Sequence, residues 1–483
     1  MGNYRFFYVL CSAIVLVFAF LGYLFSPKEF DENILLLVLI AAGGLIALYV
    51  FSKEEYSWLK GQTVKCSSLF LFAFTVVSFQ IYVDVLLGNV SPDDPFLMLR
   101  SSLICKVAFL SLSGLSAFLC GYFWQKGKIY VSRGGEIVPL GPLIVFTTVL
   151  FPVWFFIMGP AYFTGGYGIA GRLAGVERNA FASYVALIME LMIYAIPFLH
   201  AKNLRSLRIR PSLWCFIRGM GWYNAIVVSY LLLEISSGER DVIIRALLSL
   251  GVSYFWASGF KVSRKLFCIL LFSAALVLTT LGIARDFNIG GSFSEKISMA
   301  IESERPIESV FPQGQELAAS VRCVHAVVDA VPSKHPHLFG GFQLQHIISP
   351  IPTGNRWCQI VGILPAKWQY GGAANFVTWL RQGDNPSYGD GTAVLVDLYL
   401  DFGILGVVSI MFLFGFWVRR FDVNLYSPYM CPTPLLAASF IYTIASVYIT
   451  RSSILHELKH AVWLFIVIYV YEHAFGKKSI RSN

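Results

Sequence analysis

Five arginines of this 483-residue chain stand beside long apolar segments, where their guanidinium groups could hold a phosphate. They are Arg172, Arg178, Arg240, Arg285 and Arg451. A guanidinium group donates two parallel hydrogen bonds to two phosphate oxygens, in a fixed geometry that an ammonium group lacks. Several such groups at one membrane surface could grip a lipid-linked diphosphate and stabilise the charge that builds on it as it departs. This chemistry would need no metal ion.

A structural role for these arginines remains open. Arginines at helix ends often extend toward lipid phosphates or pair with a neighbouring acid. Asp241 and Arg245 are four residues apart, a spacing that lets them pair on one helix face. We therefore expect Arg245 to be held by Asp241.

Three carboxylates form a second group with chemical potential. Asp390, Asp397 and Asp401 fall with Val394 on one face of a predicted helix. Carboxylates at a membrane edge are costly unless they meet water or cations. They are expected to face a hydrated cavity lined by the arginines, or else to belong to an amphipathic helix at the interface.

Histidine and aromatic side chains gather in the long polar segment 284–391. Imidazoles suit proton transfer and aromatic faces suit sugar rings, although structural roles are equally open. His335 and His337 flank a proline and do not form a metal-binding pattern, so no metal site is expected. The residues concerned are His325, His335, His337, His346, Trp357, Trp368, Tyr370 and Trp379.

The elements that position these residues follow from composition. The chain is 57% hydrophobic and 13% charged, whereas soluble domains carry about 25% charged residues. Apolar runs long enough to cross a bilayer must be helical, because lipid cannot hydrogen-bond a bare backbone. Twelve spans are predicted: Tyr4–Phe25, Asn33–Phe51, Ser67–Leu87, Leu103–Trp124, Leu140–Met158, Phe181–Leu199, Phe216–Ile235, Val242–Ala257, Leu266–Ile283, Gly403–Val418, Pro434–Thr450 and Ala461–Phe475.

Loop charges orient these spans. Alternate connections are rich in lysine and arginine, and basic loops stay in the cytoplasm. The sequence thus predicts an all-α polytopic integral membrane protein with about 12 transmembrane helices and both termini cytoplasmic. Residues 1–283 carry nine spans, 284–391 form one large extracytoplasmic loop, and 392–483 carry three spans and the tail. The net charge of +9 reflects these loops, and we expect no nucleic acid partner.

The nine cysteines are scattered, and most lie in or beside spans. There a thiol behaves as a small apolar group. Cys323 and Cys358 both fall in the extracytoplasmic loop. A disulfide between them is an expectation, because that compartment is oxidising.

Short motifs and the overall layout resemble those of the oligosaccharide repeat-unit polymerases, the Wzy-type O-antigen polymerases of the bacterial envelope. The resemblance in layout covers the whole chain, whereas the resemblance in motifs covers only a small part of it. Arg172 and Arg178 sit in a loop where the family has arginine-x-glycine motifs, but the following glycine is missing here. The similar positions are Gly238-Glu239-Arg240, Arg285, the stretch from Asn375 through Tyr388, Gly389, Asp397, Phe402, Gly403 and Gly406, and Arg451.

The resemblance implies a reaction between two undecaprenyl-diphosphate-linked oligosaccharides at the periplasmic face of the inner membrane. A sugar hydroxyl of one attacks the anomeric carbon of the other, and undecaprenyl diphosphate leaves. It implies a diphosphate clamp at Arg240 and Arg285, with substrate binding by Arg172, Arg178, Arg451, Tyr388 and Asp390. It also implies no cofactor or metal, and a chain-length regulator and a flippase as partner proteins.

A base must help to deprotonate the attacking hydroxyl. Glu239, Asp397 and His456 are the candidates, and the sequence does not rank them. Glu239 adjoins Arg240, so a salt bridge that fixes the arginine is the alternative role for this carboxylate.

Two other functions remain open. An O-antigen ligase has a similar layout and donor, but depends on a loop histidine in a glycine-containing context that is not evident here. A flippase or other transporter would place charges near the bilayer midplane and break helices there. Lys106, Glu190, Glu234 and Arg245 are candidate intramembrane charges, although several lie near span ends.

Overall fold

The computed structural model describes residues 3–126, 129–131, 137–164, 180–237, 239–286, 309–311, 314–386 and 389–476. All regular secondary structure in these residues is helical. Eight helices are long and apolar enough to cross a membrane, or up to nine if a bent pair forms one span. The prediction of an all-helical chain with many membrane-spanning helices is thereby confirmed.

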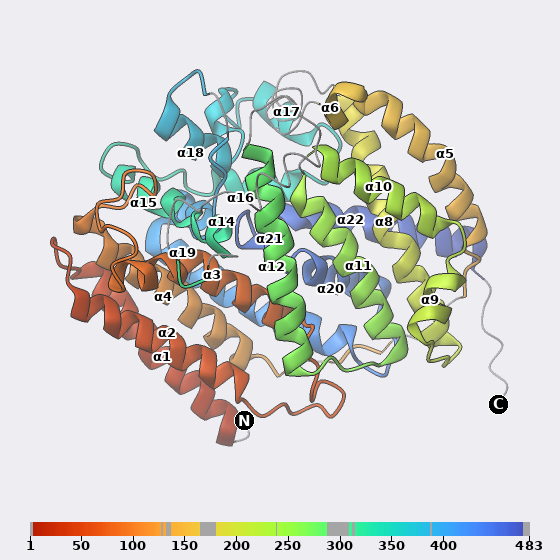
Figure 1. Cartoon of the computed structure of the whole chain (residues 1–483), viewed down its shortest axis with the longest axis horizontal. Helices are drawn as coiled ribbons and strands as arrows, with labels where there is room; N and C mark the ends of the chain where they lie inside the picture. The colour runs from red at the N-terminus through yellow and green to blue at the C-terminus, as the bar shows by residue number, and fades with distance from the viewer. Residues whose placement is uncertain are drawn as a thin grey trace.

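The first half of the chain forms most of the long helices (Figure 1). Their boundaries lie within two residues of the first five predicted spans, and α8 continues seven residues beyond the end of the sixth. The helices are α1 (Asn3–Leu24), α2 (Glu32–Val50), α3 (Cys66–Leu86), α4 (Ser101–Trp124), α5 (Gly141–Met158), α6 (Pro160–Thr164), α8 (Ala180–Ser206), α9 (Leu213–Gly219), α10 (Tyr223–Ser237), α11 (Arg240–Ser258) and α12 (Arg264–Asp286).

The seventh predicted span is not one straight helix. Helices α9 and α10 meet at an angle of 93°. Gly221 takes a positive φ of 57° at the break, a conformation that glycine adopts easily. The side chain of Asn224 donates hydrogen bonds to the carbonyl oxygens of Ile217 and Gly221, each at 2.8 Å. These bonds satisfy carbonyls that the interrupted helix leaves without a partner.

The second half begins with short helices and ends with longer ones. They are α14 (Gln315–Ala318), α15 (Val321–Ala330), α16 (Gly341–Ile348), α17 (Gly354–Ile360), η2 (Trp368–Tyr370), α18 (Ala373–Gln382), α19 (Val394–Leu425), α20 (Thr433–Ile444), α21 (Ser446–Ile449), η3 (Leu455–Glu457) and α22 (Leu458–Phe475). Helix α19 starts nine residues before the predicted span and is kinked at Gly403, where φ is 63° and ψ is −154°.

Helices α4 and α19 form the centre of the bundle, and glycines let their backbones touch. A Cβ atom on Gly121 would lie 1.9 Å from the Phe412 carbonyl oxygen, and one on Gly415 would lie 1.9 Å from the Phe118 carbonyl oxygen. Small residues allow membrane helices to approach this closely. The most apolar stretch of α4 is 89% buried, against 28% for α1. Helix α1 therefore presents its apolar side chains to lipid.

The short helices α15 to α18 lie in the upper part of Figure 1, away from the N-terminus. They are anchored to the long helices. The Tyr82 hydroxyl of α3 lies 3.0 Å from Nε2 of His325 in α15. The backbone N–H groups of Leu338 and Phe339 donate to carbonyls of Leu400 and Asp401 in α19. The segment between α12 and α19 thus shares the core of the bundle.

The expected disulfide between Cys323 and Cys358 is not formed, because all nine cysteines are free. Cys323 is buried in α15, and its thiol donates to the backbone oxygen of Asp390 at 3.5 Å. Cys358 lies in α17, a separate helix. The fold thus uses Cys323 as a small buried side chain.

Candidate functional site

A cavity of about 310 Å³ lies among α5, α8, α10, α11 and the start of α22. Figure 1 shows these helices on the side of the bundle away from α1 and α2. Two candidate bases, Glu239 and His456, both line it although they come from different halves of the chain. Its other polar lining residues are Tyr162, Ser183, Glu190, Tyr230, Glu234, Asp241, Arg245, Lys459 and His460.

Arg245 is the buried cation of this cavity, with a side chain only 6% exposed. Its guanidinium lies 3.1 Å from Glu190 of α8 and 3.7 Å from Glu457 of η3. It also pairs with Asp241 one turn earlier in α11, as the spacing of four residues predicts. Three acids on three helices therefore surround one arginine.

Histidines extend this network toward Asp397. His460 lies 3.5 Å from Glu190 and 3.1 Å from Glu457. The ring of His456 is 5.9 Å from that of His460 and 5.9 Å from that of His346.

Asp397 stands at the far end of this network. Nε2 of His346 lies 3.6 Å from its Oδ1 atom, and its Oδ2 atom accepts a hydrogen bond from Ser453 at 2.7 Å. His456 and Asp397 thus belong to one series of neighbouring titratable side chains, and Glu239 lines the same cavity as His456.

Local structure explains how Glu239 reaches the cavity, whereas the next residue, Arg240, does not line it. Glu239 is the extended N-cap residue of α11, and its backbone N–H donates to the Glu234 carbonyl at the end of α10. The chain therefore turns sharply between the two helices. Arg240 opens α11, where the aligned peptide dipoles favour a bound anion. Gly238, in the middle of this turn, lies outside the described residues.

Asp390 and Arg451 belong to a second polar group that does not line the cavity. The buried Asp390 carboxylate pairs with Arg381 and lies 3.6 Å from Arg322. Burial raises the pKa of the nearby Cys323 thiol to about 11, and charges on Arg322, Asp390, Arg451 and Arg381 also act on it. Arg451 follows Thr450, whose carbonyl oxygen accepts a hydrogen bond from the backbone N–H of Val394, four residues after Asp390.

Four sequence-predicted site residues are not placed by the described structure. Arg172, Arg178 and Tyr388 lie outside the described residues. Arg285 falls in the last turn of α12, but its side chain is outside what is described.

Several residues of the site were not predicted from the sequence. Arg322 and Arg381 carry no local signal, because only the fold brings them to Asp390. The group His456, Glu457 and His460 did carry one: histidines four residues apart with a glutamate after the first, the H-E-x-x-H spacing of many metal sites. The possible ligand atoms of these three residues lie within 4.8 Å of one another.

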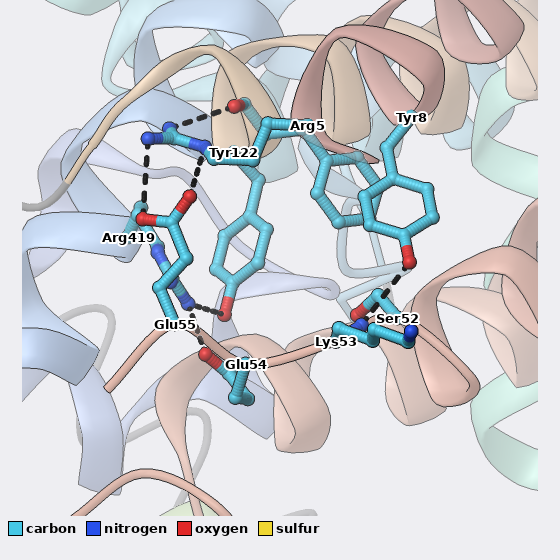
Figure 2. Close-up of a pocket in the computed structure, with 9 residues that line it drawn as sticks. Arg5, Tyr8, Ser52, Lys53, Glu54, Glu55, Tyr122 and Arg419 are labelled. Carbon is cyan, nitrogen blue, oxygen red and sulfur yellow. Dashed lines mark hydrogen bonds and ion pairs between the residues drawn. The ribbon is translucent and has the colours of Figure 1, made fainter. Parts of the chain in front are cut away.

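A third charged group lies elsewhere in the bundle (Figure 2). Arg419 of α19 pairs with Glu54 at 2.8 Å and with the Tyr122 hydroxyl at 3.1 Å, while Lys65 pairs with Glu54 at 2.9 Å. The enclosed space is only about 20 Å³, room for roughly one water molecule. This group ties α19 and α4 to the connection before α3, and has no space for a substrate.

Glu54 gives this third group a pH dependence. Burial alone would raise the pKa of its carboxyl, but the charges of Lys65 and Arg419 lower the pKa to about 2. Because the folded pKa lies below the unfolded one, the stabilisation is present above about pH 4.5 and is lost as pH falls toward 2. We expect Glu54→Gln to lower the free energy of unfolding at pH 7 by on the order of 3 kcal/mol. The thermal unfolding midpoint should fall accordingly.

The pH series of this experiment is measured in detergent. The difference between wild type and Glu54→Gln should shrink steadily below about pH 4.5. Glu55→Gln is the matched control, because Glu55 is 40% exposed and its pair with Arg5 contributes little. A difference that stays constant down to pH 3 would contradict the assigned role of Glu54.

Comparison with known proteins finds no relative: no family model, no curated protein and no solved structure matches the chain. The chemistry of the cavity is therefore inferred from its own residues and their positions.

Proposed function

We propose that this protein polymerises undecaprenyl-diphosphate-linked oligosaccharide repeat units and releases undecaprenyl diphosphate. The observation that carries the proposal is one cavity, between membrane-spanning helices, that Glu239 and His456 both line beside the helix start at Arg240. The proposal places the protein in a bacterial inner membrane with twelve spans, both termini cytoplasmic, and residues 284–391 extracytoplasmic. The cavity would then open toward the periplasmic leaflet.

In the proposed reaction, a sugar hydroxyl of the acceptor attacks the anomeric carbon of the donor. A new glycosidic bond forms as the bond between that carbon and the diphosphate oxygen breaks. Arg240 and Arg285 hold the departing diphosphate, and the N-terminus of α11 adds to the favourable field. Because arginine supplies the positive charge, the reaction needs no added Mg²⁺ or Mn²⁺.

Glu239 is the base that the geometry favours. It lines the cavity and is only half-buried, so a substrate hydroxyl can reach it. Asp397 is fully buried and already accepts hydrogen bonds from Gln343 and Ser453. The proton of the attacking hydroxyl therefore passes to Glu239 in this proposal.

The group around Asp390 is proposed to bind the second substrate. Arg322 and Arg381 both lie beside the carboxylate of Asp390. The excess positive charge suits the diphosphate of the acceptor. Arg172, Arg178 and Tyr388 remain proposed substrate contacts, and a chain-length regulator and a flippase remain proposed partners.

The test uses purified full-length protein and a defined undecaprenyl-diphosphate-linked repeat unit, with products separated by size. A ladder of added repeats without nucleotide sugar, Mg²⁺ or Mn²⁺ would support the proposal. Transfer of the glycan onto added lipid A core, with no ladder, would show a ligase. If folded protein and a substrate matched to its source give neither product, both the polymerase and the ligase functions are contradicted.

Replacement of Glu239 tests the assigned base. Glu239→Gln keeps the shape of the side chain but cannot accept a proton, so we expect ladder formation to slow by about 100-fold. Glu29→Gln, which changes an exposed glutamate in the connection between α1 and α2, should leave the rate unchanged. An unchanged rate in Glu239→Gln would show that another residue acts as the base.

One observation favours a second function, the transport of a lipid-linked oligosaccharide. The bent pair α9 and α10 and the buried charges of Glu190, Glu234 and Arg245 are features that transporters place near the bilayer midplane. Protein in liposomes would then move a labelled lipid-linked oligosaccharide across the bilayer. Transport without any ladder would favour this function over polymerisation.

A further inference from the structure

We propose that His456, Glu457 and His460 form a binding site for a divalent transition-metal ion, with zinc as the ion that fits best. Their possible ligand atoms lie within 4.8 Å of one another. Glu457 is 1% exposed and His460 is 4% exposed. The inference does not depend on the proposed polymerisation and assigns a property that the reaction does not use.

The spacing of the three residues brings their side chains together. His456 and Glu457 lie in η3, which leads directly into α22, where His460 follows one turn later. Helical side chains four residues apart lie on the same face, one above the other. The H-E-x-x-H spacing uses this geometry to present two imidazoles to one metal ion.

Unused acceptors in the site point to a bound cation. Neither carboxylate oxygen of Glu457 has a hydrogen-bond donor, and Nδ1 of His460 has no hydrogen-bond partner. Nδ1 of His460 lies 3.1 Å from Oε2 of Glu457, but the angle between the imidazole and the carboxylate does not meet hydrogen-bond geometry. A buried polar atom without a partner is costly. A metal ion among these atoms would satisfy them together.

The charges around the site also favour a cation. Among the described residues that line the adjoining cavity, the four acids Glu190, Glu234, Glu239 and Asp241 accompany two lysine or arginine side chains, Arg245 and Lys459. Glu457 adds a carboxylate beside Arg245. A divalent ion would offset part of this negative excess.

Arg245 does not block the site. Its guanidinium lies nearer to Glu190, at 3.1 Å, than to Glu457, at 3.7 Å, and it also pairs with Asp241. Glu457 can therefore exchange this contact for a metal ion without leaving the arginine unpaired.

The donor set selects the class of metal. Two imidazoles and one carboxylate suit Zn²⁺, whereas Ca²⁺ and Mg²⁺ prefer oxygen ligands alone. A water molecule would fill the fourth position of a tetrahedral ion. Glu190 lies 3.5 Å from Nε2 of His460, on the other side of the ring from Nδ1, where it can orient the imidazole.

The experiment measures zinc bound to full-length protein in detergent, purified without a histidine tag, stripped with a strong chelator and dialysed against Zn²⁺. We expect about one zinc ion per chain. His456→Gln and His460→Gln should each weaken binding by roughly 100-fold, beyond the usual effect of an outer-shell change. His473→Gln is the matched control, because His473 is an exposed histidine on the same helix. Zinc that stays bound in both His456→Gln and His460→Gln would overturn the proposal.

Cobalt gives a second readout that needs no variant. Co²⁺ bound by two imidazoles and a carboxylate in a tetrahedral site should give wild-type protein intense visible absorption bands. Only the weak spectrum of hydrated Co²⁺ would overturn the proposal, even if the histidine variants failed to fold. Neither measurement uses a lipid-linked substrate, so failure of the metal site and failure of polymerisation are separate results.

Discussion

Arg240→Ala is expected to abolish polymer formation while the protein still accumulates in the membrane. The residue opens α11 beside Glu239, where, in the proposed reaction, its guanidinium group and the helix dipole would act on the same diphosphate. Removing a group that stabilises charge in the transition state typically costs 100-fold or more in rate, so we expect at least a ~100-fold slower ladder. Arg240→Lys keeps the charge but loses the bidentate geometry, and should retain only part of the activity.

The control for this experiment is Arg210→Ala. Arg210 is exposed in the connection between α8 and α9. The loop charges predict that this connection is cytoplasmic, so removal of Arg210 should leave the ladder unchanged. The rate is measured with equal amounts of folded protein, and polysaccharide length on cells gives a second readout. Full-length polymer from Arg240→Ala would remove Arg240 from the proposed clamp.

Arg245→Ala is expected to destabilise the fold itself. The substitution leaves the buried carboxylate of Glu457 and the partly buried carboxylates of Glu190 and Asp241 without the cation that they share. Removing one partner of a buried ion pair typically costs about 3–5 kcal/mol, because the remaining charge is uncompensated. We therefore expect a clearly lower thermal unfolding midpoint in detergent, and less protein in the membrane.

A second substitution separates lost charge from lost packing. Arg245→Ala combined with Glu190→Gln removes both members of the closest pair, and should be more stable than Arg245→Ala alone. Arg264→Ala is the matched control: Arg264 is exposed at the start of α12 and donates a hydrogen bond to the Val50 carbonyl, so its loss should be small. A midpoint for Arg245→Ala equal to that of Arg264→Ala would contradict the assigned role.

These two predictions address different properties of neighbouring residues. Arg240 is proposed to act on substrate, so its loss should change the rate and spare the fold. Arg245 is enclosed by acids from α8, α11 and η3, so its loss should change the fold first. The opposite pattern, a stable but inactive Arg245→Ala and an unstable Arg240→Ala, would exchange their roles.

The sequence by itself determined where the long apolar helices form, but not the short helices between residues 315 and 382. A helix or helix pair lies in each of the twelve predicted ranges, because a long apolar run can satisfy its backbone only within itself. It also determined the pair between Asp241 and Arg245, since that contact depends only on helical spacing. The H-E-x-x-H spacing from His456 to His460 was likewise visible in the sequence, although its proximity to Glu190 was not.

Only the tertiary structure decided which helices are central and which residues meet. Hydropathy does not distinguish lipid from protein as a neighbour. The most apolar stretch of α1 has a mean hydropathy of 2.4, and 28% of it is buried. The corresponding stretch of α4 has a mean hydropathy of 2.0, yet 89% of it is buried. Because lipid is as apolar as a packed helix, helix order in the bundle depends on close contacts such as that at Gly415. The cavity shared by Glu239 and His456 follows from that packing, which joins residues from opposite halves of the chain.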